Sequence, residues 1–210
     1  MLWPFSTTGV RSVVAMEWNP IDDALYALQH GRDYLFRQWP EFYDRWQSAL
    51  LPAEEFLRVR EGSNFGWPFC YYDQFLGRKL LNPEYGGDGS IVGRCADFDE
   101  PVIGFPGHWA PNGLAFYDGD QFPDRYRGGA FIAFHGSWNR APLPQQGYNV
   151  VFVPRSGDAF GPDYEVFADG FRRGEGQDGH RPTGVTVGPD GSLYISDDAG
   201  GTIWRVMHRP

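Results

Sequence analysis

The stretch Thr183-Gly-Val-Thr-Val-Gly-Pro-Asp-Gly-Ser-Leu-Tyr-Ile-Ser-Asp-Asp198, followed by Gly201-Thr-Ile-Trp-Arg-Val206, decides the fold class. Apolar and polar side chains alternate on both sides of residues 189–191, which is the pattern of half-buried strands. Within that triplet, Pro189 fixes φ, Asp190 caps the turn with its side chain, and Gly191 tolerates a positive φ. The stretch therefore predicts a unit of three short strands joined by tight turns.

The same unit occurs twice more along the chain. Repetition of a strand-and-turn unit is typical of β-propellers, whose blades are four-stranded antiparallel sheets. The fourth strand of each blade is expected in the stretches that connect the units. We predict an all-β protein with about three four-stranded blades, in which residues 1–210 form a single partial propeller domain. The earlier strands are expected at residues 13–18, 24–28, 54–59, 111–117, 129–135 and 147–153.

Three blades do not close a ring. Propellers usually have about 4–8 blades, because closure hides the unpaired edges of the outer strands. Either the chain is a fragment of a longer protein, which we favour, or a second copy completes the ring. In both cases the open edges predict self-association.

One segment departs from the strand pattern. Residues 34–53 carry Trp39, Phe42, Tyr43 and Trp46 at near-helical spacing. This spacing predicts a short amphipathic helix packed on the propeller face.

Composition excludes several classes of function. The formal net charge is −9, and there is no basic stripe of the kind that binds nucleic acid. No apolar stretch approaches the ~18 residues that cross a bilayer, so we expect no membrane span. The two cysteines, Cys70 and Cys95, are too few for a disulfide scaffold. They are either two buried thiols or one disulfide, and the sequence leaves both alternatives open.

Six further stretches occur in the order seen in one known family. Together they resemble the glucose/sorbosone dehydrogenase family, which comprises soluble six-bladed propellers that use pyrroloquinoline quinone and calcium. The His-Gly-Ser-Trp-Asn-Arg string is most similar to the sorbosone-dehydrogenase-like branch. The stretches are Thr8-Gly-Val-Arg-Ser-Val-Val-Ala15, Gln29-His-Gly-Arg-Asp33, Pro52-Ala-Glu-Glu55, Asn64-Phe-Gly-Trp-Pro68, His135-Gly-Ser-Trp-Asn-Arg140 and His180-Arg-Pro-Thr-Gly-Val185.

The resemblance implies an oxidoreductase. It oxidises an alcohol or hemiacetal carbon of an aldose or related sugar, and a hydride passes to the quinone. The sequence has no haem-attachment motif, so electrons are expected to leave to an external acceptor. The resemblance also implies a periplasmic or secreted protein, although residues 1–6 lack the basic and apolar regions of a signal peptide.

The resemblance also implies which residues hold the quinone. Arginines bind its carboxylates in that family, and two arginines here match those positions. The family usually places asparagine and proline where this chain has Ser12 and Val13, and it often has a basic residue at the position of Gly179. Ion pairing or packing competes with cofactor binding as the role of each residue. The implied cofactor-binding residues are Arg11, Trp138, Asn139, Arg140 and Arg181.

Calcium is expected at two places. Gly31 and Arg32 match positions where two backbone carbonyls bind the ion, which suits a hard cation that prefers oxygen ligands. Glu55 matches an acid associated with a second, structural calcium.

The general base of that family comes from an earlier blade that this chain lacks. His30 and His135 are expected at strand ends, but we predict that neither is the base. The chain is then the C-terminal half of the enzyme, incomplete and inactive alone. The departures at Ser12 and Gly179 favour an alternative, a non-catalytic propeller module for binding or scaffolding whose redox site has decayed.

Overall fold

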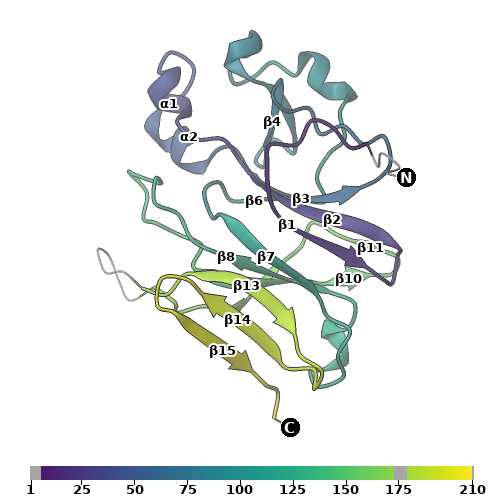
Figure 1. The fold of residues 1–210 in the computed structure, drawn as a ribbon. Helices are drawn as coiled ribbons and strands as arrows, with labels where there is room; N and C mark the ends of the chain where they lie inside the picture. The colour runs from purple at the N-terminus through teal and green to yellow at the C-terminus, as the bar shows by residue number, and fades with distance from the viewer. Residues whose placement is uncertain (1–5, 173–178, 210) are drawn as a thin grey trace.

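The computed structural model describes residues 6–172 and 179–209. Most regular structure in this part of the chain is β-strand, arranged in three larger antiparallel sheets and two small hairpins (Figure 1). The predicted mainly-β architecture is confirmed. The sheets do not close into a ring, so the number of blades in a ring is not determined by this chain.

The strands follow the predicted units closely. The first sheet has the order β1 (Ser12–Asn19), β2 (Ala24–His30), β3 (Glu54–Val59) and β6 (Ile103–Phe105). The second sheet contains β7 (Pro111–Phe116), β8 (Ala130–Phe134), β9 (Asn149–Val153) and β12 (Glu165–Ala168). The third sheet contains β13 (Pro182–Val187), β14 (Leu193–Asp197) and β15 (Thr202–Val206). Two sheets have the expected four strands, whereas the third has three within the described residues.

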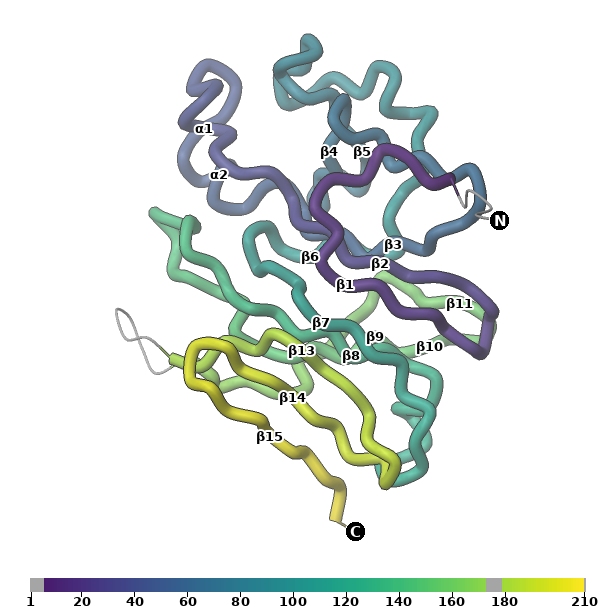
Figure 2. The backbone as a smooth tube through the Cα atoms, viewed as in Figure 1, coloured from purple at the N-terminus to yellow at the C-terminus, as the bar shows by residue number. Residues whose placement is uncertain are grey.

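The three sheets stack side by side through their first strands. β1 lies against β7, and β7 lies against β13, as the tube in Figure 2 shows. The approach of β7 to β13 is so close that a Cβ on Gly113 would lie 2.7 Å from the carbonyl oxygen of Thr183. Only glycine fits at that point of contact.

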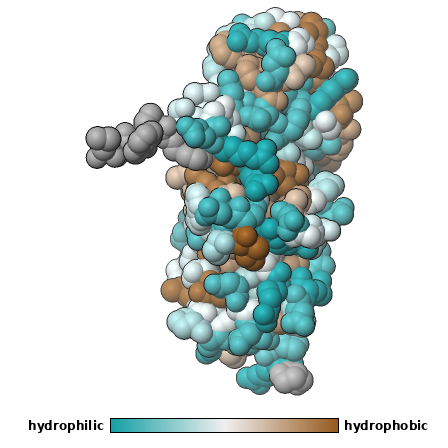
Figure 3. Space-filling view, turned by 90° about the vertical axis from the view of Figure 1, so that its right-hand side faces the viewer, coloured by the Kyte–Doolittle hydropathy of each residue, from teal (hydrophilic) through white to brown (hydrophobic). Residues whose placement is uncertain are grey.

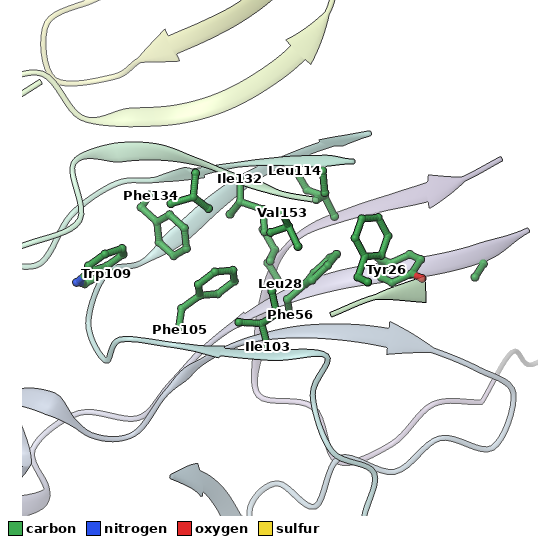
Figure 4. Close-up of a cluster of buried hydrophobic side chains, with 14 residues drawn as sticks. Tyr26, Leu28, Phe56, Ile103, Phe105, Trp109, Leu114, Ile132, Phe134 and Val153 are labelled. Atoms are coloured by element: carbon green, nitrogen blue, oxygen red, sulfur yellow. The ribbon is translucent and has the colours of Figure 1, made fainter. Parts of the chain in front are cut away.

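Aromatic-rich cores fill the spaces between neighbouring sheets. Between the first and second sheets, Tyr26, Phe56, Phe105 and Phe134 lie with aliphatic side chains in one buried cluster (Figure 4). A second cluster, containing Phe131 and others, lies between the second and third sheets. Large rings fill the wedge between twisted sheets and bury much apolar area per residue, so they contribute strongly to stability.

The segment after β2 forms two short helices, α1 (Leu35–Gln38) and α2 (Arg45–Leu50), instead of the single helix that we expected. Pro40 disfavours helical backbone at Trp39, where α1 ends. Asp44 then starts α2, because its side chain accepts from the backbone N–H of Gln47 at 2.7 Å. The predicted apolar contact is made by Tyr43, whereas Trp46 is 56% exposed.

A longer insertion separates β3 from β6. It contains the hairpin of β4 (Cys70–Asp73) and β5 (Arg78–Leu81) and the short 3₁₀ helices η1 (Pro83–Tyr85) and η2 (Gly93–Asp97). A disulfide joins Cys70 to Cys95 with their Cα atoms 5.9 Å apart, which decides between the two alternatives for these cysteines. The remaining short elements are η3 (Asp124–Tyr126) and the hairpin of β10 (Arg155–Ser156) and β11 (Ala159–Phe160).

The surface of the molecule is mixed in character. On the side that carries the hairpin turns, hydrophilic residues dominate and hydrophobic patches interrupt them (Figure 3). In the described ranges, no helix is both long enough and apolar enough to cross a membrane.

Candidate functional site

The candidate site lies at the open ends of the first hairpins of the three sheets. The last pairs of these hairpins are Ser12 with His30, Pro111 with Phe134, and Pro182 with Asp197. Residues just beyond these pairs occupy equivalent positions in each sheet, because the same hairpin is repeated. Figure 1 shows these open ends on the side of the molecule that faces α1 and α2. Residues at these positions include Arg11, Gly31, His135, Arg181 and Asp198.

Arg11 is positioned by the turn before β1. At Gly9, with φ of +69°, a Cβ would lie 2.4 Å from the backbone nitrogen of Gly66, so glycine is required there. The backbone N–H of Arg11 donates to Gln29 Oε1 at 2.9 Å, and its Nη1 donates to the carbonyl oxygen of Gly31 at 2.9 Å. The guanidinium also lies over the Trp67 ring at 5.4 Å. A guanidinium has five N–H donors, so this one keeps hydrogens for a further acceptor.

Gly31 and Arg32, the expected calcium ligands, follow β2. A Cβ on Gly31 would lie 2.7 Å from the carbonyl oxygen of Ala53, so this backbone tolerates only glycine. Its carbonyl oxygen faces a positive group, the Arg11 guanidinium. The side chain of Arg32 has a structural role, because it is buried and donates to Asn82 at 2.9 Å and Glu84 at 2.7 Å. The expected ligand is its backbone carbonyl, so this side-chain role leaves the prediction for Arg32 untouched.

Glu55 already has a cation beside it. Lys79 Nζ lies 3.0 Å from Glu55 Oε2, and Gln29 Nε2 donates to Glu55 Oε1 at 2.8 Å. Lys79 is 1% and Glu55 4% exposed, so the pair is buried. A calcium ion at this carboxylate would be repelled by the ammonium group. The arrangement does not fit the second calcium that the resemblance implies.

The described residues also offer no other cluster of side chains for a second calcium ion. Across residues 6–172 and 179–209, no group of three or more His, Cys, Asp or Glu side chains is arranged to hold a metal ion. A calcium ion bound largely by backbone carbonyls, as predicted for Gly31 and Arg32, would not form such a group.

Gln29 connects the buried ion pair to Arg11. Its amide nitrogen donates to Glu55, and its amide oxygen accepts from the Arg11 backbone. A continuous chain of hydrogen bonds thus runs from Lys79 through Glu55 and Gln29 to Arg11. This chain fixes the backbone from which the Arg11 guanidinium extends.

His30 bridges the first and second sheets. Its Nε2 lies 3.2 Å from the carbonyl oxygen of Pro111 and 2.9 Å from Asn112 Oδ1, so the proton is assigned to Nε2. Burial lowers the pKa of His30, which keeps the ring neutral. The geometry supports a structural link between sheets.

Arg181 lies in a network at the third sheet. Its Nη1 lies 3.0 Å from His135 Nδ1, and its Nη2 donates to Tyr148 Oη at 3.2 Å. Because arginine can only donate, His135 Nδ1 accepts, and its Nε2–H donates to Asp198 Oδ1 at 2.9 Å. Both nitrogens of His135 are therefore engaged.

Asp197 anchors the backbone of this network. Burial alone would raise the pKa of its carboxyl, but hydrogen bonds from backbone N–H groups, including that of Arg181, lower it to about 2. The carboxylate therefore stays ionised at neutral pH and holds the turn that presents Arg181.

The string of residues 138–140 does not act as a unit. Trp138 is 62% exposed and lies edge-on to Tyr34, with ring centroids 6.1 Å apart. Asn139 donates to Asp33 Oδ1. Arg140, in contrast, is 3% exposed and its Nη1 donates to the carbonyl oxygen of Gly107 at 3.2 Å. Packing explains the position of Arg140. Of the three residues, only Trp138 and Asn139 lie toward the open ends of the hairpins.

Three titratable residues, Glu54, Asp33 and His108, lie beside the open end of the first sheet. The sequence did not single them out as site residues. Glu54 is 3% exposed, and burial raises its pKa to about 7 even though Gly31 N donates to its Oε2 at 2.9 Å. His108 Nδ1 lies 3.2 Å from Asp33 Oδ1. Burial would lower the pKa of His108, but the hydrogen bond to Asp33 raises it. Perturbed groups of this kind often gather at functional sites.

Comparison with solved structures defines the class of fold. The chain is similar to a Trichoderma reesei protein of carbohydrate-active enzyme family AA12, with a TM-score of 0.73 at 24% identity over 93% of this chain and 52% of that one. It is also similar to the soluble aldose sugar dehydrogenase of Escherichia coli, with a TM-score of 0.58 at 22% identity over 95% and 45%. The fold is therefore of the propeller type found in these proteins.

A family model described as TrAA12-like matches residues 5–209, and the chain belongs to this family. It is 30% identical over 203 residues to an uncharacterised protein of Borreliella burgdorferi, covering 95% of this chain and 48% of the relative. It is 27% identical to the aldose sugar dehydrogenase YliI of Escherichia coli, covering 99% and 44%. A pyrroloquinoline quinone-dependent pyranose dehydrogenase of Coprinopsis cinerea is 27% identical, covering 74% and 25%.

These findings confirm the resemblance stated from the sequence. They also show that the chain spans less than half the length of the curated relatives it matches.

Proposed function

We propose that the protein is a sugar oxidoreductase, or part of one, that oxidises an alcohol or hemiacetal carbon of an aldose with hydride transfer to pyrroloquinoline quinone. The observation that carries the proposal is the equivalent placement of Arg11 and Arg181 at the open ends of the first and third sheets. Each guanidinium is held by neighbouring groups, and each belongs to a stretch that matches the family.

The residues present fit the quinone at these two positions. The free guanidinium hydrogens of Arg11 and Arg181 would bind its carboxylates, because paired N–H donors match a carboxylate well. The backbone carbonyl oxygen of Arg32 would face the calcium ion. The carbonyl oxygen of Gly31 already accepts from Arg11 Nη1 at 2.9 Å, so it would have to give up that bond to join the ligands. When bound, the quinone supplies the acceptor for the hydride. Glu55 is left out of the proposed calcium site because it already pairs with Lys79. Arg140 is left out of the proposed quinone site because its guanidinium already donates to the Gly107 carbonyl oxygen.

No described residue is assigned as the general base. His30 Nε2 and both nitrogens of His135 are engaged in hydrogen bonds with protein groups. The chain's own side chains therefore bind and orient, and proton abstraction is expected from a residue outside the described part.

The Cys70–Cys95 disulfide supports the proposed location. Disulfides persist in oxidising compartments and are rare in reducing ones, so we propose that the protein works in the periplasm or outside the cell. The electrons of each turnover would then pass to an external acceptor.

Cofactor binding tests the proposal directly. Calorimetric titration of the chain with pyrroloquinoline quinone in calcium chloride is expected to show binding that depends on the ion. Arg11→Ala and Arg181→Ala should each weaken it at least about tenfold, because a charge-assisted contact is lost. Arg127→Ala, whose side chain is 59% exposed and away from these ends, is the matched control.

The outcomes separate the two functional classes. Equal weakening in the control would mean that binding is non-specific. No quinone binding at all would favour the alternative of a binding or scaffold module. Dye reduction with a panel of aldoses then tests turnover in preparations that bind the quinone.

A further inference from the structure

A pocket of about 230 Å³ lies between the α1–α2 segment and the loop that follows β8. Figures 1 and 2 show both segments on the side where the hairpins are open. The residues proposed above to hold the quinone and the calcium ion, Arg11, Arg181, Gly31 and Arg32, do not line this pocket. Its walls are aromatic and basic, and among residues 6–172 and 179–209 no acidic side chain lines it. The residues that matter to the argument are Tyr34, Phe36, Arg37, Arg45, His108 and Asn139.

The rim of the pocket carries exposed aromatic rings. Trp138 is 62% and Tyr34 39% exposed, and their rings meet edge to face. Tyr34 also has a φ of +67°, in the left-handed region that large side chains rarely adopt. Strained backbone of this kind is found preferentially at ligand-binding sites. Exposed rings supply flat, amphipathic contact surface.

The charge of the pocket is opposite to that of the whole protein. The chain has a net charge of −9, yet Arg37 and Arg45 both line the pocket. Their guanidinium groups lie over the rings of Tyr34 and Phe36 at 5.4 and 5.3 Å. Within residues 6–172 and 179–209, neither arginine forms a hydrogen bond or an ion pair through its side chain. Their N–H donors are therefore directed to solvent and suit a carboxylate.

The pocket adjoins the proposed cofactor end. Asn139, in its wall, donates to Asp33, and Asp33 follows His30 closely in the sequence. Asp33 also holds the ring of His108, a third basic residue of the wall. A molecule that filled the pocket would extend from the open end of the first sheet.

We propose that this pocket is a subsite for a sugar ring that bears a carboxylate, a uronate unit of the saccharide substrate. The rings of Tyr34 and Trp138 would contact the C–H face of the pyranose, and Arg37 and Arg45 would bind its carboxylate. The inference rests on the proposed function for the choice of a saccharide. The carboxylate is inferred from the charge of the pocket itself.

Calorimetry with two matched ligands tests the inference without quinone. Trigalacturonate is compared with its methyl ester, which keeps the rings and loses the charges, and with gluconate, an open-chain sugar acid. We expect the acid to bind more tightly than the ester and gluconate. Trp138→Ala should weaken both trisaccharides about tenfold, through lost ring contact. Arg37→Gln and Arg45→Gln should each weaken only the acid, about fivefold.

Two control variants show whether loss of any exposed tryptophan or arginine would weaken binding. Trp18→Ala removes a tryptophan that is 49% exposed on β1, and Arg127→Gln removes an exposed arginine remote from the pocket. Neither should change binding. Near-ultraviolet circular dichroism of each variant shows that its fold is retained.

Several results would overturn the subsite. They are equal binding of acid and ester, binding of gluconate as tight as that of trigalacturonate, no binding of either trisaccharide, or unchanged binding in Trp138→Ala. Because these titrations contain no quinone, they fail or succeed separately from the test of the proposed function.

Discussion

At the scale of single residues, the buried pair of Lys79 and Glu55 is the feature in which the structure departs most from the family expectation. An ammonium group lies beside the carboxylate where the resemblance implies a metal ion. Both side chains are almost fully buried, so each charge depends on the other for compensation. The pair also begins the chain of hydrogen bonds that ends at Arg11.

Lys79→Met should therefore be strongly destabilising. It leaves the Glu55 carboxylate buried without its counter-charge, which typically costs about 3–5 kcal/mol in the free energy of unfolding. Urea denaturation measures the loss. The double variant Lys79→Met/Glu55→Gln removes both charges and should recover most of that free energy. A double variant as unstable as Lys79→Met alone would show that packing of the lysine stem, not charge pairing, stabilises this place.

Glu54 should make stability depend on pH. Its pKa is raised to about 7 in the folded protein, above its ordinary value of 4.5, because burial disfavours the charged form. The folded state therefore binds more protons than the unfolded state between these values, and stability falls as pH rises through this window. The shift corresponds to about 3 kcal/mol between pH 4.5 and 7.

Urea denaturation of the wild type and Glu54→Gln across that pH range isolates this contribution. The glutamine keeps an acceptor for the backbone N–H of Gly31 but does not titrate. The difference in unfolding free energy between the two proteins should change with pH in the direction given. A constant difference would mean that Glu54 keeps its ordinary pKa.

At the scale of secondary-structure elements, the hairpins were predictable and the insertions were not. Alternation of apolar side chains and the turn at residues 189–191 predicted β13 and β14, because both signals are local. The hairpin of β4 and β5 has strands of 4 residues each. It depends on distant contacts, including the bond from Ala53 N to the Tyr72 carbonyl oxygen at 3.1 Å. Such contacts leave no periodic pattern in the sequence.

The same distinction holds for the candidate site. Arg11 and Arg181 were predicted from the resemblance, because each lies in a stretch that matches the family, and in the structure each directly precedes the first strand of its sheet. Glu54 and His108 could not be identified in that way. The raised pKa of Glu54 arises from burial, and His108 meets Asp33 across 75 positions of the sequence. Only the folded chain brings these groups together.

At the scale of the whole molecule, the two outermost sheets each leave apolar side chains exposed on their outer faces. Met16 pairs with Ala27 on the face of the first sheet opposite to Tyr26 and Leu28, which pack against the second sheet. Met16 is 62% exposed. On the third sheet, Ile203 is 73% exposed on the face opposite to Ile195, beside a hollow of about 390 Å³. The second sheet, in contrast, buries both of its faces, because it packs against the first sheet on one side and the third sheet on the other.

We therefore expect this chain on its own to self-associate through the outer faces, because apolar patches of this kind drive association. Sedimentation velocity should show a mass that rises with protein concentration. Met16→Lys and Ile203→Lys place a charge on each face and should shift the chain toward the monomer. Phe75→Lys, at a residue 64% exposed in the turn between β4 and β5, is the matched control and should leave the mass unchanged. A monomer at every concentration would contradict this expectation, and an equal effect of the control would show that general charge, not the sheet faces, governs association.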